Sequence, residues 1–214
     1  MKPMGYFQSF WLLLSKDVRL ELRSKQTMMT MLLFGVVLTF LYAIGFETSP
    51  GVNRKVFPGI VWGALLFTGA LGVGRTFSRE SSSGAFEALV LSGLPRSCLL
   101  LSKFVVNVAL ILLVMVVVVP LIAIMLRVDL TNLEMVLALQ ILVGTIGFSS
   151  IATPLSVIAI GARFPEVLLP VVIFPLVTPI LIAGVKGTGV LMGVAIGDSP
   201  WGWLNFSAAF SVVF

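Results

Sequence analysis

The sequence predicts an all-α integral membrane protein, a bundle of six transmembrane helices with an amphipathic helix at its amino terminus. Hydrophobic residues make up 58% of the 214 positions and charged residues only 11%, whereas soluble domains have roughly 25% charged residues. Long apolar runs recur along the chain, and charged residues bound them. This composition excludes a disordered chain and a soluble catalytic domain.

Five apolar runs reach the length of about 17 to 25 residues that a helix needs to cross the hydrocarbon core. The predicted spans are residues 28–46, 57–74, 104–126, 135–162 and 167–185. No Asp, Glu, Lys or Arg lies within them, so a proton relay or an ion-coupled carrier has no evident titratable group. A sixth run, 201–214, is too short to span alone. It is either an interfacial segment or, as we favour, the start of a sixth span that is incomplete in this chain. Residues 1–214 then form one transmembrane domain.

The basic residues predict the orientation of the chain. Ten of the 14 Lys and Arg residues lie in residues 1–27, in the loop 75–103 and in the short turn between the fourth and fifth spans. Because cytoplasmic loops carry the excess of basic residues, the amino terminus is predicted to be cytoplasmic. The net charge of +5 therefore has a topological explanation, and no nucleic-acid partner is needed to account for it.

Residues 1–27 are predicted to form an amphipathic helix at the membrane surface. Large apolar side chains recur every three to four residues, at Phe7, Trp11, Leu14, Val18 and Leu22. Charged residues occupy much of the remaining helix surface, and the basic ones suit anionic lipid headgroups. The alternative is a solvated cap on the first span.

The loop 75–103 combines charge with exposed apolar residues. Its Ser-Ser-Ser-Gly stretch at 81–84 is a typical helix start, and Gly93 and Pro95 would stop the helix. The predicted product is a short amphipathic helix over 84–91 with Phe86 and Leu89 on one side. Such an apolar face requires a groove, and composition alone favours the lipid headgroup layer and a partner protein equally.

A family resemblance favours the partner protein. The pattern resembles the cytoplasmic loop of ABC-2 type export permeases; it consists of Phe77, Arg79, Glu80, Gly84, Phe86, Glu87, Leu89, Leu94 and Pro95. More narrowly, Phe-Pro-Gly-Ile-Val-Trp at 57–62 and the proline-bearing run at 168–184 are similar to the CcmB family, the haem exporter protein B subunit of the cytochrome c maturation system. The resemblance covers nearly the whole chain.

The resemblance implies a fold, a location and partners. The bundle would be of the ABC-2 exporter type, multi-pass in the bacterial inner membrane, and 84–91 would be the coupling helix that docks on an ATPase subunit. Phe86 and Leu89 would fill the groove of the ATPase, Gly84 would begin the helix, and Glu80 and Glu87 would make polar contacts at the rim. The implied partners are the ATPase CcmA, the membrane subunits CcmC and CcmD, and the haem chaperone CcmE, whose haem-loaded form the complex would release.

The chain itself lacks the residues of an ATPase or a metalloenzyme. A Walker A loop needs a Gly-Lys-Ser/Thr sequence, and none of the six lysines follows a glycine. Histidine is absent, and Cys98 is the only cysteine, so no metal site is predicted. We therefore expect a permease subunit that is not an enzyme, with ATP bound by the partner subunit. Haem is expected as a ligand that the complex transports or handles, and no haem site is assigned to this chain.

Two features inside the spans carry functional hypotheses. Pro170, Pro175 and Pro179 each remove a backbone donor from the fifth span, so that helix should be bent or broken, as a fixed kink or as a gate. Neutral polar residues in the third and fourth spans line a path or bond between helices: Asn107, Gln140, Thr145, Ser149, Ser150, Thr153 and Ser156.

Two other functions remain as alternatives. The first keeps the ABC-2 architecture but exports a drug, a lipid or a polysaccharide. The second is a membrane scaffold that transports nothing and only positions its partners. The absence of histidine and of carboxylates in the spans argues against a membrane enzyme.

Overall fold

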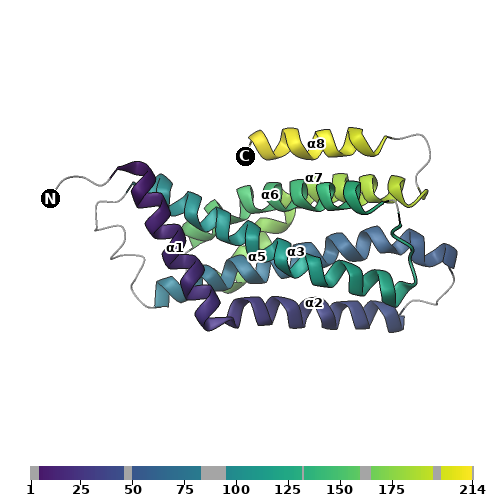
Figure 1. Cartoon of the computed structure of the whole chain (residues 1–214), viewed down its shortest axis with the longest axis horizontal. Coiled ribbons are helices and arrows are strands. Elements are labelled where there is room, and N and C mark those ends of the chain that lie inside the picture. Colours follow the sequence, from purple (N-terminus) through teal and green to yellow (C-terminus); the bar gives the residue numbers. More distant parts are fainter. Residues whose placement is uncertain are drawn as a thin grey trace.

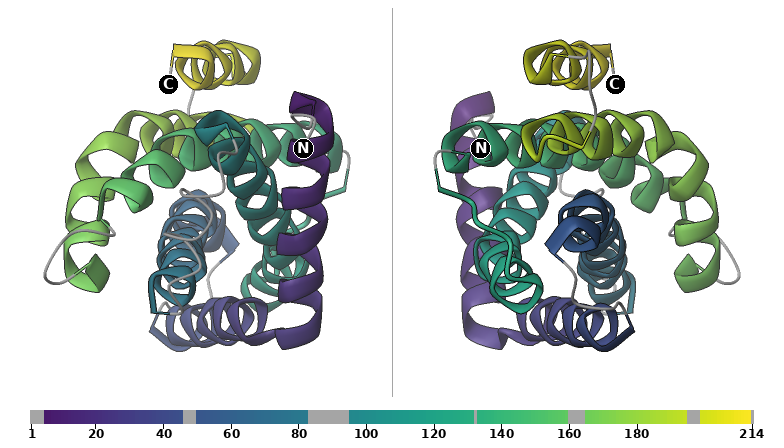
Figure 2. Two further views of the ribbon diagram at one scale, coloured as in Figure 1. Left: turned by 90° about the vertical axis from the view of Figure 1, so that its left-hand side faces the viewer. Right: turned by 90° about the vertical axis from the view of Figure 1, so that its right-hand side faces the viewer.

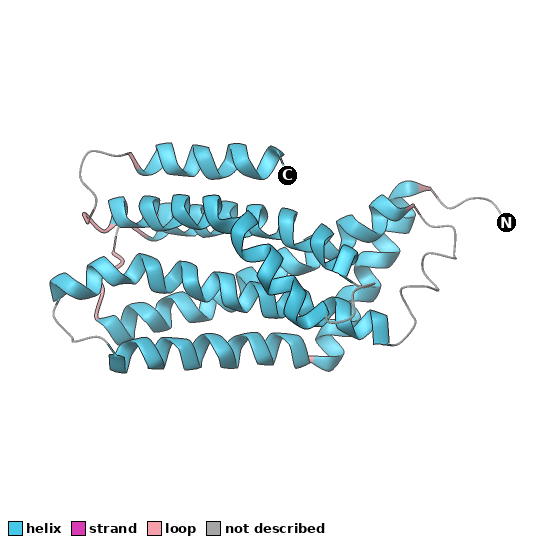
Figure 3. Cartoon of the chain, turned by 180° about the vertical axis from the view of Figure 1, so that it is seen from behind, coloured by secondary structure: helices cyan, strands magenta, loops and turns pink. Residues whose placement is uncertain are grey.

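The computed structural model describes residues 5–45, 50–82, 95–131, 133–159, 165–194 and 199–213. Within these ranges helices joined by short loops are the only regular secondary structure, with no strand (Figure 3). The helices are α1 (Tyr6–Ser24), α2 (Gln26–Gly45), α3 (Pro50–Ser82), α5 (Arg96–Leu126), α6 (Glu134–Ala159), α7 (Pro165–Leu191) and α8 (Pro200–Val213).

Five of these helices, α2, α3, α5, α6 and α7, are long and apolar enough to cross a membrane. Each contains one of the predicted spans, apart from the ends of those predictions that lie outside the described residues. This result supports a multi-pass membrane protein, because length and apolar composition together are what a bilayer demands of a helix. The predicted sixth segment forms α8, which has 14 residues and is below spanning length.

The helix α3 lies at the centre of the bundle, in contact with α2, α5, α6 and α7 (Figures 1 and 2). In its most apolar stretch 72% of the residues are buried inside the chain, against 17% for α2. The exposed face of α2 is apolar, with Leu33, Val37 and Leu41 among its exposed side chains. Since lipid tails solvate such a face, its exposure agrees with a position at the edge of the bundle in a bilayer.

The helix α1 runs crosswise over one end of the bundle (Figures 1 and 2). It ends at Lys25, whose left-handed backbone (φ 52°) turns the chain into α2. Most of the predicted apolar stripe faces outward, since Phe7, Trp11, Val18 and Leu22 are exposed, whereas Leu14 packs against the main core. The opposite face, carrying Ser9, Leu13 and Asp17, is buried. Outward apolar side chains suit a helix at a lipid surface, and the position of α1 at the membrane surface stays a prediction.

Trp62 is the largest fully buried side chain of the core, with 1% of its surface exposed. Its indole Nε1–H donates to the hydroxyl of Thr188 on α7 at 2.9 Å. The indole ring lies against the backbone of Gly144 on α6 and Gly184 on α7, where an added Cβ would overlap ring atoms. These two glycines therefore allow three helices to close around one large side chain.

A methyl group at Gly184 is expected to destabilise this packing. We expect Gly184→Ala to lower the free energy of unfolding by about 1–3 kcal/mol, the usual effect of overpacking a rigid core. Gly189→Ala on the same helix is the matched control, because a Cβ at Gly189 meets nothing within 4 Å. Thermal unfolding of both variants in detergent checks this expectation, and equal melting temperatures would contradict it.

Candidate functional site

The residues predicted to couple the chain to an ATPase lie largely outside the described part of the structure. Gly84, Phe86, Glu87 and Leu89 fall between the described ranges, and Glu80 is described only as part of the α3 backbone. The flanking helices are described. α3 ends at Ser82 and α5 begins at Arg96, both at the end of the bundle that α1 crosses (Figure 1). We call this the α1 end of the bundle.

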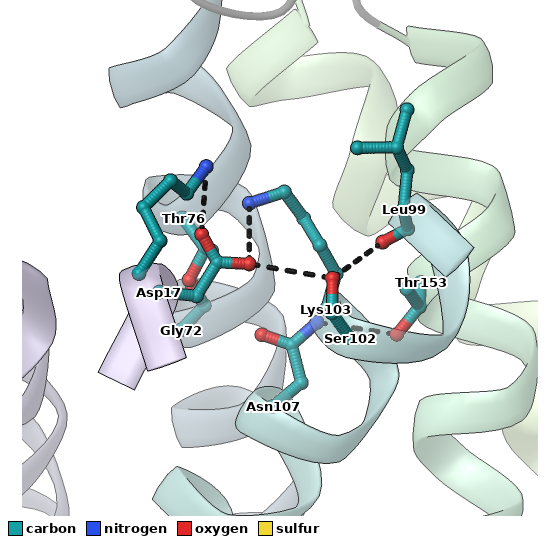
Figure 4. Close-up of polar contacts among 9 residues, drawn as sticks. Asp17, Gly72, Thr76, Leu99, Ser102, Lys103, Asn107 and Thr153 are labelled. Carbon is teal, nitrogen blue, oxygen red and sulfur yellow. Dashed lines mark hydrogen bonds and ion pairs between the residues drawn. The ribbon is translucent and has the colours of Figure 1, made fainter. Parts of the chain in front are cut away.

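A buried ion pair joins α1 to α5 at the α1 end (Figure 4). The Nζ of Lys103 lies 3.5 Å from the Oδ2 of Asp17, and the two side chains are only 5% and 6% exposed. The ammonium of Lys16, at the edge of the pair, lies 2.9 Å from Oδ1 of the same carboxylate. Two cations around one carboxylate offset part of the desolvation of the buried charges.

Neutral polar groups continue this cluster from α5 into α6 (Figure 4). The Ser102 hydroxyl lies 3.5 Å from Asp17 Oδ2 and 3.0 Å from the carbonyl oxygen of Leu99. One turn beyond Lys103, the amide of Asn107 donates to the Thr153 hydroxyl at 3.1 Å. Asp17, Lys103, Asn107 and Thr153 thus form a buried polar line across three helices.

The neutral polar residues of the spans are mostly buried, and several of them bond between helices. Besides the bond from Asn107 to Thr153, the amide of Gln140 on α6 donates to the carbonyl of Ala183 on α7 at 3.4 Å. Ser150 and Ser156 instead donate to carbonyls of their own helix. The hydroxyls of Thr145 and Ser149 are buried and have no hydrogen-bond partner among the described residues. Interhelical bonds therefore join Asn107 to Thr153 and Gln140 to Ala183, while Oδ1 of Asn107 and Oε1 of Gln140 are buried and have no hydrogen-bond partner among the described residues.

The helical segments include charged residues that sequence reasoning left outside the spans. α5 begins at Arg96, eight residues before the predicted start, and its buried face includes Lys103. α7 extends to Leu191 and contains Lys186, which is exposed. The predicted ends were set at the charged residues themselves, but a lysine can continue a helix when its head finds a counter-charge or water. From the sequence alone, a charged residue at the edge of an apolar run was the only sign of where a helix ends.

The helix α7 is continuous through Pro170, Pro175 and Pro179. The prolines therefore do not break it, and Figure 2 shows the helix curving along its length. Pro175 is exposed, while the other two are partly covered. A bend is the expected response to lost backbone donors. Whether the bend acts as a fixed kink or as a gate stays a prediction.

The described residues contain no group of three or more His, Cys, Asp or Glu side chains placed to hold a metal ion. Cys98 is buried, and its sulfur lies 3.6 Å from the carbonyl oxygen of Tyr6 on α1. This thiol therefore packs between α1 and α5.

Comparison with known proteins settles the family. The family described as CcmB protein matches residues 8–214. This chain belongs to the CcmB family. Among its relatives is "Heme exporter protein B" of Pseudomonas aeruginosa, 29% identical over 175 residues, which are 82% of this chain and 78% of that protein. The Haemophilus influenzae protein of that name is 27% identical over 170 residues, 79% of this chain and 76% of that protein. The Paracoccus denitrificans protein of that name is 26% identical over 200 residues, 94% and 90% of the two chains.

The residues that the CcmB family matches include those of the α1 end of the bundle. The matched range includes all of α3 and α5 and the predicted coupling residues between them. The polar line from Asp17 to Thr153 also lies inside this range. Sequence reasoning missed the ion pair, because residues 17 and 103 become neighbours only when α1 crosses the bundle.

Proposed function

We propose that this chain is the permease subunit of an ABC-type complex that acts in cytochrome c biogenesis and exports or handles haem. The observation that carries the proposal is the CcmB match over residues 8–214, with relatives named "Heme exporter protein B". Five helices able to span a membrane suit a permease. The lack of a Gly-Lys-Ser/Thr sequence suits a subunit that takes its energy from a separate ATPase.

The proposed partners follow from the resemblance to the CcmB family. An ATPase subunit, CcmA, docks on the 84–91 segment, with Phe86 and Leu89 as apolar anchors and Glu80 and Glu87 at the rim. CcmC and CcmD complete the membrane part, and hydrolysis by CcmA drives the release of haem-loaded CcmE. Haem is the handled ligand, and ATP binds to the partner.

Loss of covalently bound haem tests this function. Deleting the gene in its native host is expected to abolish c-type cytochromes on haem-stained gels, while b-type haem absorbance persists. The gene returned on a plasmid is the control and should restore the staining. Normal c-type cytochromes in the deletion strain would overturn the proposal and favour export of a drug, a lipid or a polysaccharide. If a variant that no longer binds the ATPase still restores the staining, the chain acts as a membrane scaffold that only positions its partners.

The proposed location is the inner membrane, with a cytoplasmic amino terminus. In a Cys98→Ala background, Ser82→Cys at the end of α3 is expected to react with a membrane-impermeant maleimide in inverted vesicles but not in intact spheroplasts. Ser199→Cys, an exposed position before α8, is the control and should react in spheroplasts. The reverse pattern would invert the topology.

A further inference from the structure

The face of α1 that packs on the bundle carries a carboxylate. Ser9, Leu13 and Asp17 are spaced four residues apart and form the buried stripe of the helix. A buried carboxylate is unfavourable unless a counter-charge lies beside it, so Asp17 restricts where α1 can rest on the bundle.

Lys103 of α5 supplies that counter-charge from 86 residues away in the sequence. Its Nζ lies 3.5 Å from Asp17 Oδ2, with both side chains buried. Lys16 contacts the same carboxylate, but its side chain is 35% exposed and belongs to α1 itself. Lys103 is therefore the described cation that ties the carboxylate to a different helix.

The described residues form a small buried apolar cluster between α1 and α5, and Leu14 of α1 packs against the main core. Leu13, Cys98 and Leu99, with Phe10 packed against them, form a cluster separate from the main core. Apolar contact of this kind is non-directional, whereas an ion pair fixes the position of a helix along its axis. We infer that Asp17 and Lys103 form a positioning pair that holds α1 in place across the start of α5.

The second step of the inference rests on the proposed function. Lys103 lies in the first turns of α5, the helix that follows the predicted coupling segment, and Asn107 one turn later bonds to Thr153 of α6. If the start of α5 moves, the ion pair therefore moves α1 with it, and the hydrogen bond from Asn107 to Thr153 moves α6. The pair serves energy coupling by keeping these three helices in register, without touching ATP or haem.

Cys98 gives a direct readout of the position of α1. It is the only cysteine of the chain, it is buried, and its sulfur lies against the α1 backbone. Asp17→Asn and Lys103→Gln are each expected to raise the rate of Cys98 labelling by a small maleimide about tenfold, because α1 opens more often. The charge-swapped chain, Asp17→Lys with Lys103→Asp, is expected to restore protection. Arg19→Gln, at an exposed position of the same helix, is the matched control and should leave the rate unchanged.

The labelling experiment uses the complex in native membranes, and the same samples are assayed for c-type haem and for the retained ATPase subunit. We expect the single variants to keep the ATPase and to lose most c-type haem, and the swapped chain to recover it. Unchanged Cys98 labelling in both single variants overturns the positioning pair, and so does failure of the swap to restore protection. Exposed Cys98 with full c-type haem overturns the coupling step alone. If the unaltered chain retains no ATPase, the proposed function fails, while the labelling still decides the positioning pair.

Discussion

Replacing Phe86 and Leu89 together by aspartate is expected to weaken the binding of the ATPase subunit by about 2 kcal/mol or more, a loss of roughly 30-fold in affinity. The reason is that large apolar side chains in the centre of an interface are its usual anchors, and a carboxylate there is desolvated without a partner. Co-purification from gently solubilised membranes measures the effect. The double variant should still insert into the membrane, because residues 84–91 lie outside the predicted spans.

A matched variant separates this effect from general damage to the loop. Ser92→Asp adds one of these two negative charges just past the 84–91 helix without altering the predicted apolar face, and it should retain the ATPase. If the Phe86 and Leu89 variant co-purifies with as much ATPase as the unaltered chain, the coupling helix is not at 84–91. The loop would then face the lipid headgroups, the other outcome that its composition allows.

The second large effect is expected at Trp62. Trp62→Ala should lower the stability of the folded chain by about 3–5 kcal/mol, because it leaves a cavity between α3, α6 and α7 and removes the donor to Thr188. The measurement is thermal unfolding in detergent, with the fraction of protein that stays monodisperse as the readout. Trp201→Ala is the control: Trp201 is 53% exposed, so its removal should have little effect. Equal losses from the two variants would show that Trp62 is not central to the packing.

Hydropathy predicted the positions of the spans because a bilayer imposes one rule on every helix that crosses it. The same rule placed the ends of two helices wrongly. Lys103 and Lys186 were treated as boundaries, yet α5 and α7 run through both residues. Lys103 lies beside a buried counter-charge and Lys186 is exposed, and neither condition can be recognised within a window of neighbouring residues.

The residues of the α1 end divide in a similar way. The coupling segment at 84–91 lies outside the described residues and stays a prediction, which rests on helix-start residues, an apolar face and a stop signal within one short stretch. The pairing of Asp17 with Lys103 could not be predicted, because it depends on α1 crossing the bundle. The contact of Trp62 with Gly144 and Gly184 is equally non-local, since it joins three helices that are far apart in the sequence.

The central claim is that this CcmB-family chain works as the permease of a haem-handling ABC-type complex. Affinity purification from gently solubilised native membranes, with mass spectrometry of the partners and a haem absorption spectrum of the same sample, tests it most directly. We expect to recover a Walker-bearing ATPase together with a second membrane subunit that carries haem absorbance. Recovery of the chain with neither an ATPase nor haem would contradict it.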